Sequence, residues 1–308
     1  MIINRADYIA KLSAKSWNGK VKIITGIRRC GKSFLLSVLF KQHLIETGVT
    51  EDSFIEIDLE KRRDVKYRNP NVLYDYVVKK SSDMGKRYYV FIDEIQLSYR
   101  VKSTDIDEKS VPEEDRELLY TTFYDVLNDL MGHPNLDVYV TGSNSKMLST
   151  DIVTNFRDRG SEIRVYPLSF KEFCQTKELD KIDALEEYLA YGGMPLAVLE
   201  DDEAEKRKYL INLYKNVYLK DIIERNKLKD ITLLDTLTDV LSSSVGSLTN
   251  PHKLANTACS ILGKTTSDST IKKYINILED AYLFSCSKRW NVKGRKYFGS
   301  IQKYYAVD

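Results

Sequence analysis

The sequence predicts an α/β fold in which a parallel sheet comes first, a helical subdomain follows and a winged helix ends the chain. Short apolar runs typical of buried parallel strands alternate with helical segments as far as residue 168. Helical spacing without a strand pattern fills residues 169–229. From residue 230, helical segments lead into a basic β-hairpin, which is the order of elements in a winged helix. We therefore expect domains at residues 1–168, 169–229 and 230–308.

Length and composition are those of a soluble protein with more than one domain. The chain has 308 residues, 43% hydrophobic and 30% charged, and its net charge of +2 argues neither for nor against a nucleic-acid partner. No apolar run approaches the roughly 18 residues of a membrane span, and the start lacks the apolar core of a signal peptide. We therefore expect a cytoplasmic protein with no membrane partner. The four cysteines lie far apart and away from the histidines, which excludes a zinc-finger spacing and argues against a disulfide framework.

The first expected elements surround a glycine-rich loop. A short amphipathic helix is expected over residues 6–16, an apolar strand over residues 21–25, and an apolar helix from residue 34 until Gly48 ends it. Between this strand and the second helix lies Gly-Ile-Arg-Arg-Cys-Gly-Lys-Ser, which has the Gly-x-x-x-x-Gly-Lys-Ser spacing of a phosphate-binding loop. Such a loop directs backbone N–H groups at a polyphosphate and places the positive end of a helix beside it.

This spacing predicts a P-loop NTPase site for ATP. Lys32 is expected to reach the β- and γ-phosphate oxygens, and the Ser33 hydroxyl is expected to ligate Mg²⁺. The alternative is a glycine-bracketed turn that binds nothing, and the strand before the loop and the helix after it argue against that alternative. The expected nucleotide-binding residues are Gly26, Ile27, Arg28, Arg29, Cys30, Gly31, Lys32, Ser33 and Phe34.

Two acidic residues end a later buried strand. A strand at residues 54–59, a charged loop and a helix at residues 71–84 come first, and then the apolar run at residues 88–92 ends in Asp93 and Glu94. Ligands of an open parallel sheet lie outside the carboxyl ends of its strands, so we expect Asp93 at the Mg²⁺ and Glu94 at the attacking water. A strand that ends in two solvated acids is the alternative.

Further polar candidates lie beside the fourth and fifth expected strands, at residues 136–141 and 162–166. After the fourth strand, Asn144 either senses the γ-phosphate or caps a helix from residue 146, and the two earlier motifs favour the sensor. Before the fifth strand, Arg157 and Arg159 either reach the nucleotide of a neighbouring subunit or are solvated. Spacing alone favours solvated charges. Upstream of these strands, the sequence predicts an acidic surface insertion at residues 97–117 and a helix at residues 118–131.

The remaining chain is predicted to be mainly helical, with a Gly-Gly-Met-Pro turn as a hinge at residues 192–195. The expected helices are residues 170–177, 183–191, 203–226, 230–245, 251–262 and, after a Ser267 cap, 268–280. The hairpin is expected to pair residues 282–287 with 296–298, and residues 302–308 form a further strand pattern that stops at the last residue. Its basic residues are Lys288, Arg289, Lys293, Arg295 and Lys296.

Several of these motifs together resemble a known family. They are the loop at residues 26–33, Asp-Glu-Ile-Gln at 93–96, Thr-Gly-Ser-Asn-Ser at 141–145, Tyr-Pro-Leu-Ser-Phe at 166–170 and Tyr-Gly-Gly-Met-Pro at 191–195. Over essentially its whole length the chain resembles uncharacterised prokaryotic P-loop ATPases of the AAA+ superfamily, close to the archaeal-type and origin-recognition-like branches. The resemblance implies a sheet of strand order 5-1-4-3-2 and a winged helix after the ATPase domain.

The resemblance also bears on individual residues. Two arginines are habitual in the loop of this family, and Arg28 and Arg29 match them. The family's Gly-Arg before the fifth strand is here Asp158-Arg159, which implies a finger or sensor role for Arg159. Members usually continue into a domain that resembles restriction endonucleases. This chain lacks that domain, so we expect its winged helix to be truncated at the C-terminal end.

These observations favour a Mg²⁺-dependent ATPase coupled to a winged helix, with Glu94, Asn144 and Arg159 in catalysis and Ser33 and Asp93 at the metal. DNA and a second copy of the chain are the expected partners. The first alternative is a nucleotide-dependent switch or scaffold that binds a protein partner without hydrolysis. A phosphotransferase acting on a small molecule and a DNA-binding regulator that needs no ATP are the others. The adjacent acids favour hydrolysis.

Overall fold

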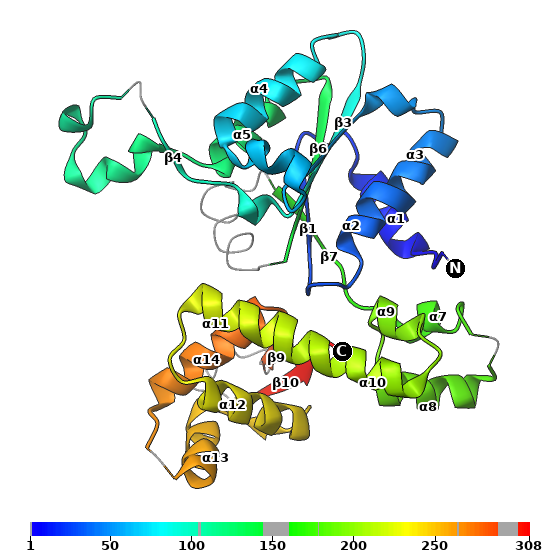
Figure 1. The fold of residues 1–308 in the computed structure, drawn as a ribbon, viewed down its shortest axis with the longest axis vertical. Coiled ribbons are helices and arrows are strands. Elements are labelled where there is room, and N and C mark those ends of the chain that lie inside the picture. Colours follow the sequence, from blue (N-terminus) through cyan, green and yellow to red (C-terminus); the bar gives the residue numbers. More distant parts are fainter. Residues whose placement is uncertain (1, 104–105, 144–159, 178, 264, 289–300) are drawn as a thin grey trace, which may run out of the picture. The chain divides into compact units, whose positions relative to one another are not determined.

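A five-stranded parallel sheet is the centre of the N-terminal part of the chain, within the residues that the computed structural model describes (Figure 1). These residues are 2–103, 106–143, 160–177, 179–263, 265–288 and 301–308. The strands of the sheet are β1 (Val21–Thr25), β2 (Phe54–Asp58), β3 (Tyr88–Asp93), β6 (Leu136–Gly142) and β7 (Gly160–Arg164). Every residue of β1, β3 and β6 is buried, which explains why their sequences are nearly continuous apolar runs.

The order of strands in this sheet is β2-β3-β6-β1-β7. The sequence analysis did not predict two short strands, β4 (Val101–Lys102) and β5 (Tyr120–Thr121), which pair with each other outside the sheet and shift the later strand labels. When the five strands of the sheet alone are numbered along the chain, their order read from the β7 edge is 5-1-4-3-2, which is the expected order. β1 therefore lies between β6 and β7, and its last residue, Thr25, is level with Gly142 of β6.

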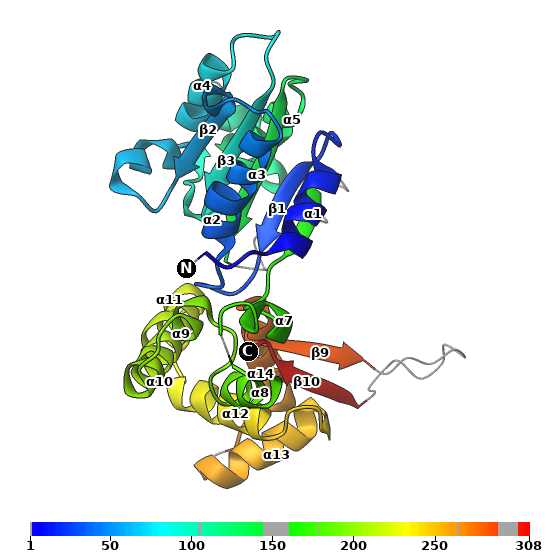
Figure 2. The ribbon, with the colours of Figure 1, turned by 90° about the vertical axis from the view of Figure 1, so that its right-hand side faces the viewer.

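Helices cover both faces of the sheet (Figures 1 and 2). On one face lie α4 (Pro70–Lys80) and α5 (Phe123–Met131), whose apolar side chains share a core with β3 and β6. On the other face, α1 (Ala6–Lys15) accompanies the helical run α2 (Lys32–Phe34), η1 (Leu35–Phe40) and α3 (Lys41–Glu46). The Phe40 ring packs there on the rings of Phe91 and Tyr139, with centroids 6.3 and 5.3 Å away.

Two details of these helices differ from the expected ones. The segment η1 is a π-helix, where the sequence predicts a regular α-helix. The helix expected over residues 118–131 begins at Phe123, because Thr122 and Asp125 form a capping box there and Tyr120–Thr121 is strand β5. The connections contain short 3₁₀ helices, namely η2 (Glu51–Ser53), η3 (Arg62–Arg68), η4 (Ile95–Leu97), η5 (Glu108–Ser110) and η6 (Glu113–Leu119).

The described chain divides into two compact units. The first contains Ile2–Gly26 and Gly31–Val165, and the second contains Ile27–Cys30 together with Tyr166–Asp308. The tip of the glycine-rich loop thus packs with the second unit. Helices of this unit include α7 (Phe170–Phe173), α8 (Lys181–Tyr191), α9 (Pro195–Val198), α10 (Glu203–Asn212), the π-helical η8 (Leu213–Leu219) and α11 (Lys220–Asn226).

A C-terminal module, residues 230–308, completes the second unit. Its elements are α12 (Ile231–Ser243), β8 (Leu248–Thr249), α13 (Pro251–Leu262), α14 (Asp268–Asp280), β9 (Phe284–Lys288) and β10 (Gln302–Ala306). The Ser267 side chain caps α14 by accepting the N–H of Thr270. The strands pair in the order β8-β10-β9.

The expected pairing of the hairpin in this module is wrong. β9 pairs with β10, so residues 302–306 occupy the place predicted for residues 296–298. The sequence contains two strand-like runs after β9, and local propensity does not show which of them completes the sheet. Arg289, Lys293, Arg295 and Lys296 lie outside the described residues.

The turn between α8 and α9 requires glycine. The Gly193 carbonyl accepts the N–H of Leu168 at 2.7 Å, and its own N–H donates to the Asp308 carboxylate at 2.6 Å. A Cβ on Gly193 would lie 2.0 Å from the carbonyl oxygen of Leu168, which no side chain can tolerate without a backbone shift.

Within the described residues, no helix is long and apolar enough to cross a membrane.

We expect Gly193→Ala to destabilise the chain by about 1–3 kcal/mol, because the backbone at Leu168 has to move. This corresponds to a fall of several degrees in Tm, measured by thermal unfolding. Gly85→Ala is the control, since a Cβ there meets only the end of the exposed Asp83 side chain, at 3.3 Å, and no backbone atom. Equal Tm values for the two variants would contradict the argument.

Candidate functional site

The glycine-rich loop leaves the carboxyl end of β1 and ends where α2 begins. Its backbone has positive φ at Gly26 (144°), Arg29 (63°) and Gly31 (93°). Left-handed residues within a loop help successive N–H groups converge on one point and form a concavity that binds anions. Arg29 carries a Cβ, so this conformation costs about 1–2 kcal/mol and persists only because the surroundings hold it.

Lys32 is the buried cation of this loop, with 3% of its surface exposed. Its ammonium donates to the carbonyl oxygen of Gly26 at 3.0 Å, so the side chain lies back across the loop. Ile27 and Cys30 are buried, whereas Phe34 is 45% exposed at the start of the helix. The loop therefore offers a phosphate its backbone N–H groups and one ammonium, which fits a polyphosphate ligand.

Ser33 and Asp93 meet at the end of β3. The Ser33 hydroxyl donates to Asp93 Oδ1 at 2.9 Å, and the Thr141 hydroxyl, from the end of β6, donates to the same oxygen. A hydroxyl and a carboxylate are the hard oxygen donors that Mg²⁺ prefers, and this metal usually takes one or two protein ligands along with phosphates and water. The residues present thus fit a Mg²⁺ held jointly with a nucleotide.

Glu94 is next to Asp93, 8% exposed, and has a left-handed backbone with a φ of 52°. Its N–H donates to Thr141 Oγ1 at 3.0 Å. Its carboxylate Oε2 accepts hydrogen bonds from the Gln96 amide and from the Ser143 hydroxyl, the latter at 3.2 Å. The carboxylate is therefore held in a defined place next to Asp93.

These contacts identify partners that the sequence analysis did not assign. Gln96, Thr141 and Ser143 belong to the motifs that carry the family resemblance, but no role was attached to them. They could have been predicted from the fact that β3 and β6 are neighbours, because polar residues at the ends of adjacent parallel strands meet at one edge of the sheet.

Burial raises the pKa of the Asp93 carboxyl above its usual range. The hydrogen bonds from Thr141 and Ser33 act in the opposite direction, and the negative charges of Glu94 and Asp58 add to the rise. Keeping the buried Asp93 carboxylate ionised costs free energy when no cation is bound. A dication bound there would favour the ionised form and remove that cost.

A family model described as an AAA domain matches residues 18–174, just over half of the chain. The chain belongs to this family. The AAA domain contains the loop, Ser33, Asp93 and Glu94. A second model, described as a domain of unknown function, matches residues 182–308.

Relatives match along most of the chain. An uncharacterized protein of Haemophilus influenzae is 31% identical over 312 residues, which cover 100% of this chain and 72% of that protein. An uncharacterized protein of Methanocaldococcus jannaschii is 27% identical over 304 residues, which cover 94% of this chain and 60% of that protein. The chain thus spans less than three quarters of these relatives. The match to the solved structure of the Aeropyrum pernix ORC1 protein in complex with DNA covers 100% of this chain and 90% of that chain. Its identity of 12% and its TM-score of 0.39 are too low to bear on function.

Two site residues expected from the sequence, Asn144 and Arg159, lie outside the described residues. Asn144 follows Ser143 directly, and Ser143 is the buried residue that bonds Glu94. Arg159, like Arg157, precedes the first residue of β7. The roles of Asn144 and Arg159 remain predictions from the sequence.

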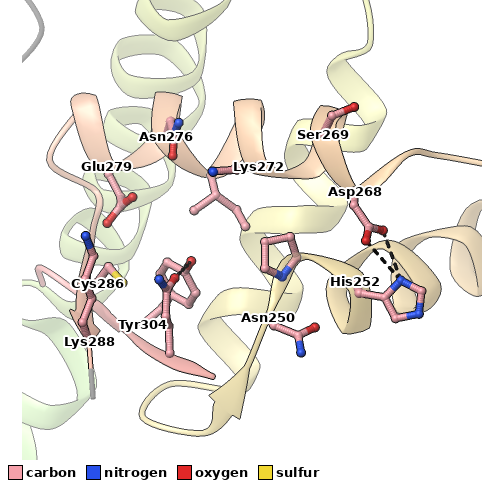
Figure 3. A pocket seen from close by; sticks show the side chains of 13 residues that line it. Asn250, His252, Asp268, Ser269, Lys272, Asn276, Glu279, Cys286, Lys288 and Tyr304 are labelled. Carbon is pink, nitrogen blue, oxygen red and sulfur yellow. Dashed lines mark hydrogen bonds and ion pairs between the residues drawn. The ribbon is translucent and has the colours of Figure 1, made fainter. Parts of the chain in front are cut away.

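A second candidate site is a polar groove of about 820 Å³ in the C-terminal module (Figure 3). It is lined by α14, by the start of α13 and by strands β9 and β10. Lys272 and Lys288 contribute positive charge, Glu279 contributes negative charge, and an exposed His252–Asp268 pair, 3.2 Å apart, lies at one end. This mixed set of donors and acceptors suits a polar ligand better than an apolar one.

We expect Asp93→Asn to raise the Tm of the ligand-free protein at pH 7.5. A carboxyl whose pKa is raised on folding stabilises the fold below its unfolded pKa, near 3.8, and this contribution is lost as pH rises through the folded pKa. Asparagine avoids that loss and keeps an oxygen for both hydrogen bonds, since Ser33 and Thr141 both donate to Oδ1.

The measurement is thermal unfolding in EDTA at pH 5 and pH 7.5, with the exposed Asp75→Asn as control. The gain should be larger at the higher pH. A gain that is the same at both pH values, or no gain at pH 7.5, would show that the buried charge of Asp93 does not limit stability.

Proposed function

We propose that this chain is a Mg²⁺-dependent ATPase. The observation that carries the proposal is the convergence of Lys32, Ser33, Asp93 and Glu94, in which the two metal-binding groups share a 2.9 Å hydrogen bond. Membership of the AAA domain family supports nucleotide binding. ATP and Mg²⁺ as the specific ligands rest on the donor set, which matches a polyphosphate and a hard cation.

Each residue has a separate task in this reaction. The loop N–H groups and Lys32 bind the phosphates, and Ser33 with Asp93 orients the Mg²⁺, which supplies charge stabilisation when it is bound. Glu94 orients the attacking water. Its hydrogen bonds to Gln96 and Ser143 both involve Oε2, so Oε1 is the oxygen proposed to accept the proton of that water. Asn144 as a γ-phosphate sensor, and Arg159 as a finger within a homo-oligomer, complete the proposal.

A nucleotide-dependent switch that binds a protein partner without turnover would use the same loop. Such a switch has no need for a carboxylate held next to the metal residues. The placement of Glu94 therefore favours hydrolysis over binding alone.

We expect Glu94→Gln to bind Mg²⁺-ATP like the wild type and to hydrolyse it about 100-fold more slowly or worse, because only the proton acceptor is lost. Lys32→Ala is the contrast, since it removes binding and turnover together. Saturating Mg²⁺-ATP, at about 100 times its Kd, stabilises a binding-competent protein by about 2.7 kcal/mol, or roughly 5–10 °C in Tm. Phosphate release and thermal shift are the two measurements.

The three proteins separate the alternatives. A wild type that shifts in Tm but releases no phosphate is a switch and not an enzyme. A wild type with no shift at all refutes the nucleotide site. Wild-type turnover by Glu94→Gln removes this residue from the mechanism.

We also propose that the C-terminal module is a winged helix that binds duplex DNA. Its elements run α12, β8, α13, α14, β9, β10, which is the winged-helix order, and its groove carries two lysines at one side of α14. Lys272 is on α14 and Lys288 ends β9, immediately before the basic residues of the hairpin connection. Glu279 and Asp268 argue for weak binding, since they repel phosphates.

We expect the double variant Lys272→Ala/Lys288→Ala to bind duplex DNA more weakly at 50 mM salt. Two lost phosphate contacts should reduce the slope of log K against log salt by about 1.8. Lys253→Ala is the matched control, because Lys253 lies on α13 of the same module but does not line the groove. Fluorescence anisotropy at several salt concentrations measures the slope, and identical slopes for all three proteins would rule out the groove.

A further inference from the structure

We propose that Tyr218 is a positioning residue of the nucleotide site, which it serves by fixing the direction of one backbone N–H in the glycine-rich loop. The proposal rests on the proposed ATP site and adds a residue 190 positions away in the sequence. Tyr218 lies in the π-helical segment η8. Residues Ile27–Cys30 of the loop belong to the same compact unit as this segment.

The key contact is a hydrogen bond from the Tyr218 hydroxyl to the carbonyl oxygen of Arg28, at 3.1 Å. In a trans peptide the carbonyl and the following N–H point in opposite directions, and the described chain contains no cis bond. Because the Arg28 carbonyl points toward Tyr218, the N–H of Arg29 points away from Tyr218. Under the proposal, this N–H is one of those that bind the phosphates.

The backbone of Arg29 explains why this peptide needs a restraint. Its φ of 63° is disfavoured for a residue with a Cβ, so a free loop tends to rotate the peptide between Arg28 and Arg29. Tyr218 opposes that rotation with one hydrogen bond. Burial also raises the pKa of Tyr218, so its hydroxyl stays protonated and remains a donor at every working pH.

A second contact restrains Arg28 through its side chain. Arg28 Nη1 lies 3.3 Å from Asp221 Oδ1, one helical turn beyond Tyr218, and Asp221 also pairs with Arg225 at 2.5 Å. The Arg28 side chain is thereby directed to the helix. Arg28 contributes its peptide to the loop's geometry, while Lys32 supplies the charge to the phosphates.

The test compares Tyr218→Phe with Tyr214→Phe. Both remove one hydroxyl from η8, but the hydroxyl of Tyr214 faces Asp235 of α12, at 3.4 Å, and not the loop. Loss of one neutral hydrogen bond should weaken Mg²⁺-ATP binding about fivefold in Tyr218→Phe and leave Tyr214→Phe unchanged. Binding is measured by competition with a fluorescent ATP analogue, and turnover should show a raised KM with kcat within about twofold of the wild type.

A direct readout is the backbone amide signal of Arg29 in protein labelled with ¹⁵N-arginine. Mg²⁺-ATP should shift this signal in the wild type, and Tyr218→Phe should alter its position before any nucleotide is added. This measurement is independent of turnover.

The outcomes are distinct from those of the proposed function. A wild type that does not bind ATP refutes the ATP site itself. A wild type that binds ATP, with a Tyr218→Phe variant of equal affinity and an unmoved Arg29 signal, refutes the positioning role. A fall in ligand-free Tm without a change in affinity would make Tyr218 a packing residue only.

Discussion

The Thr141 hydroxyl joins the ends of β3 and β6, and the geometry of the candidate site depends on it. It donates to the Asp93 carboxylate and accepts the N–H of Glu94, so one oxygen orients the proposed Mg²⁺ ligand and the adjacent catalytic candidate. This is possible because β3 and β6 are parallel neighbours, with Ile92 level with Val140, so that both chains leave the sheet at the same edge. The left-handed turn at Glu94 then brings its carboxylate back toward Ser143. Sheet register thus brings Thr141 to Asp93 and Glu94, and the turn at Glu94 completes the arrangement.

Those parts of the fold and site that follow from chain direction could be predicted from the sequence. Apolar runs such as residues 88–92 predict buried strands, and parallel strands place their carboxyl ends together, so the proximity of Ser33 and Asp93 follows from two motifs without a structure. The AAA domain match agrees with that expectation. The roles of Asn144 and Arg159 depend on positions outside the described residues and remain predictions.

Features that depend on pairing across the chain could not be predicted. The fully buried Lys22 forms an ion pair with Asp137 on the neighbouring strand, and burial lowers the pKa of Lys22 although Asp137 opposes the change. Each of the two looks like a solvent-facing residue in its own sequence. For the same reason, the sequence does not predict that β9 pairs with β10, nor does it predict the two-residue strands β4, β5 and β8. A π segment such as η8 inserts one residue into a helix, which hydrophobic spacing does not register.

The contact between Tyr218 and Arg28 has a consequence through linkage. If Tyr218 stabilises the loop conformation that binds nucleotide, then nucleotide stabilises the position of Tyr218 by the same free energy. Tyr218 lies in a continuous helical run from α10 through η8 to α11, and α11 shares a core with α12 and α14 of the C-terminal module. The positive φ of Arg29 is strained for a residue with a Cβ, so the hydrogen bond from Tyr218 restrains a peptide that would be costly to hold alone. Under the proposal, the Tyr218 hydroxyl is therefore the point at which occupancy of the loop would be linked to this helical run.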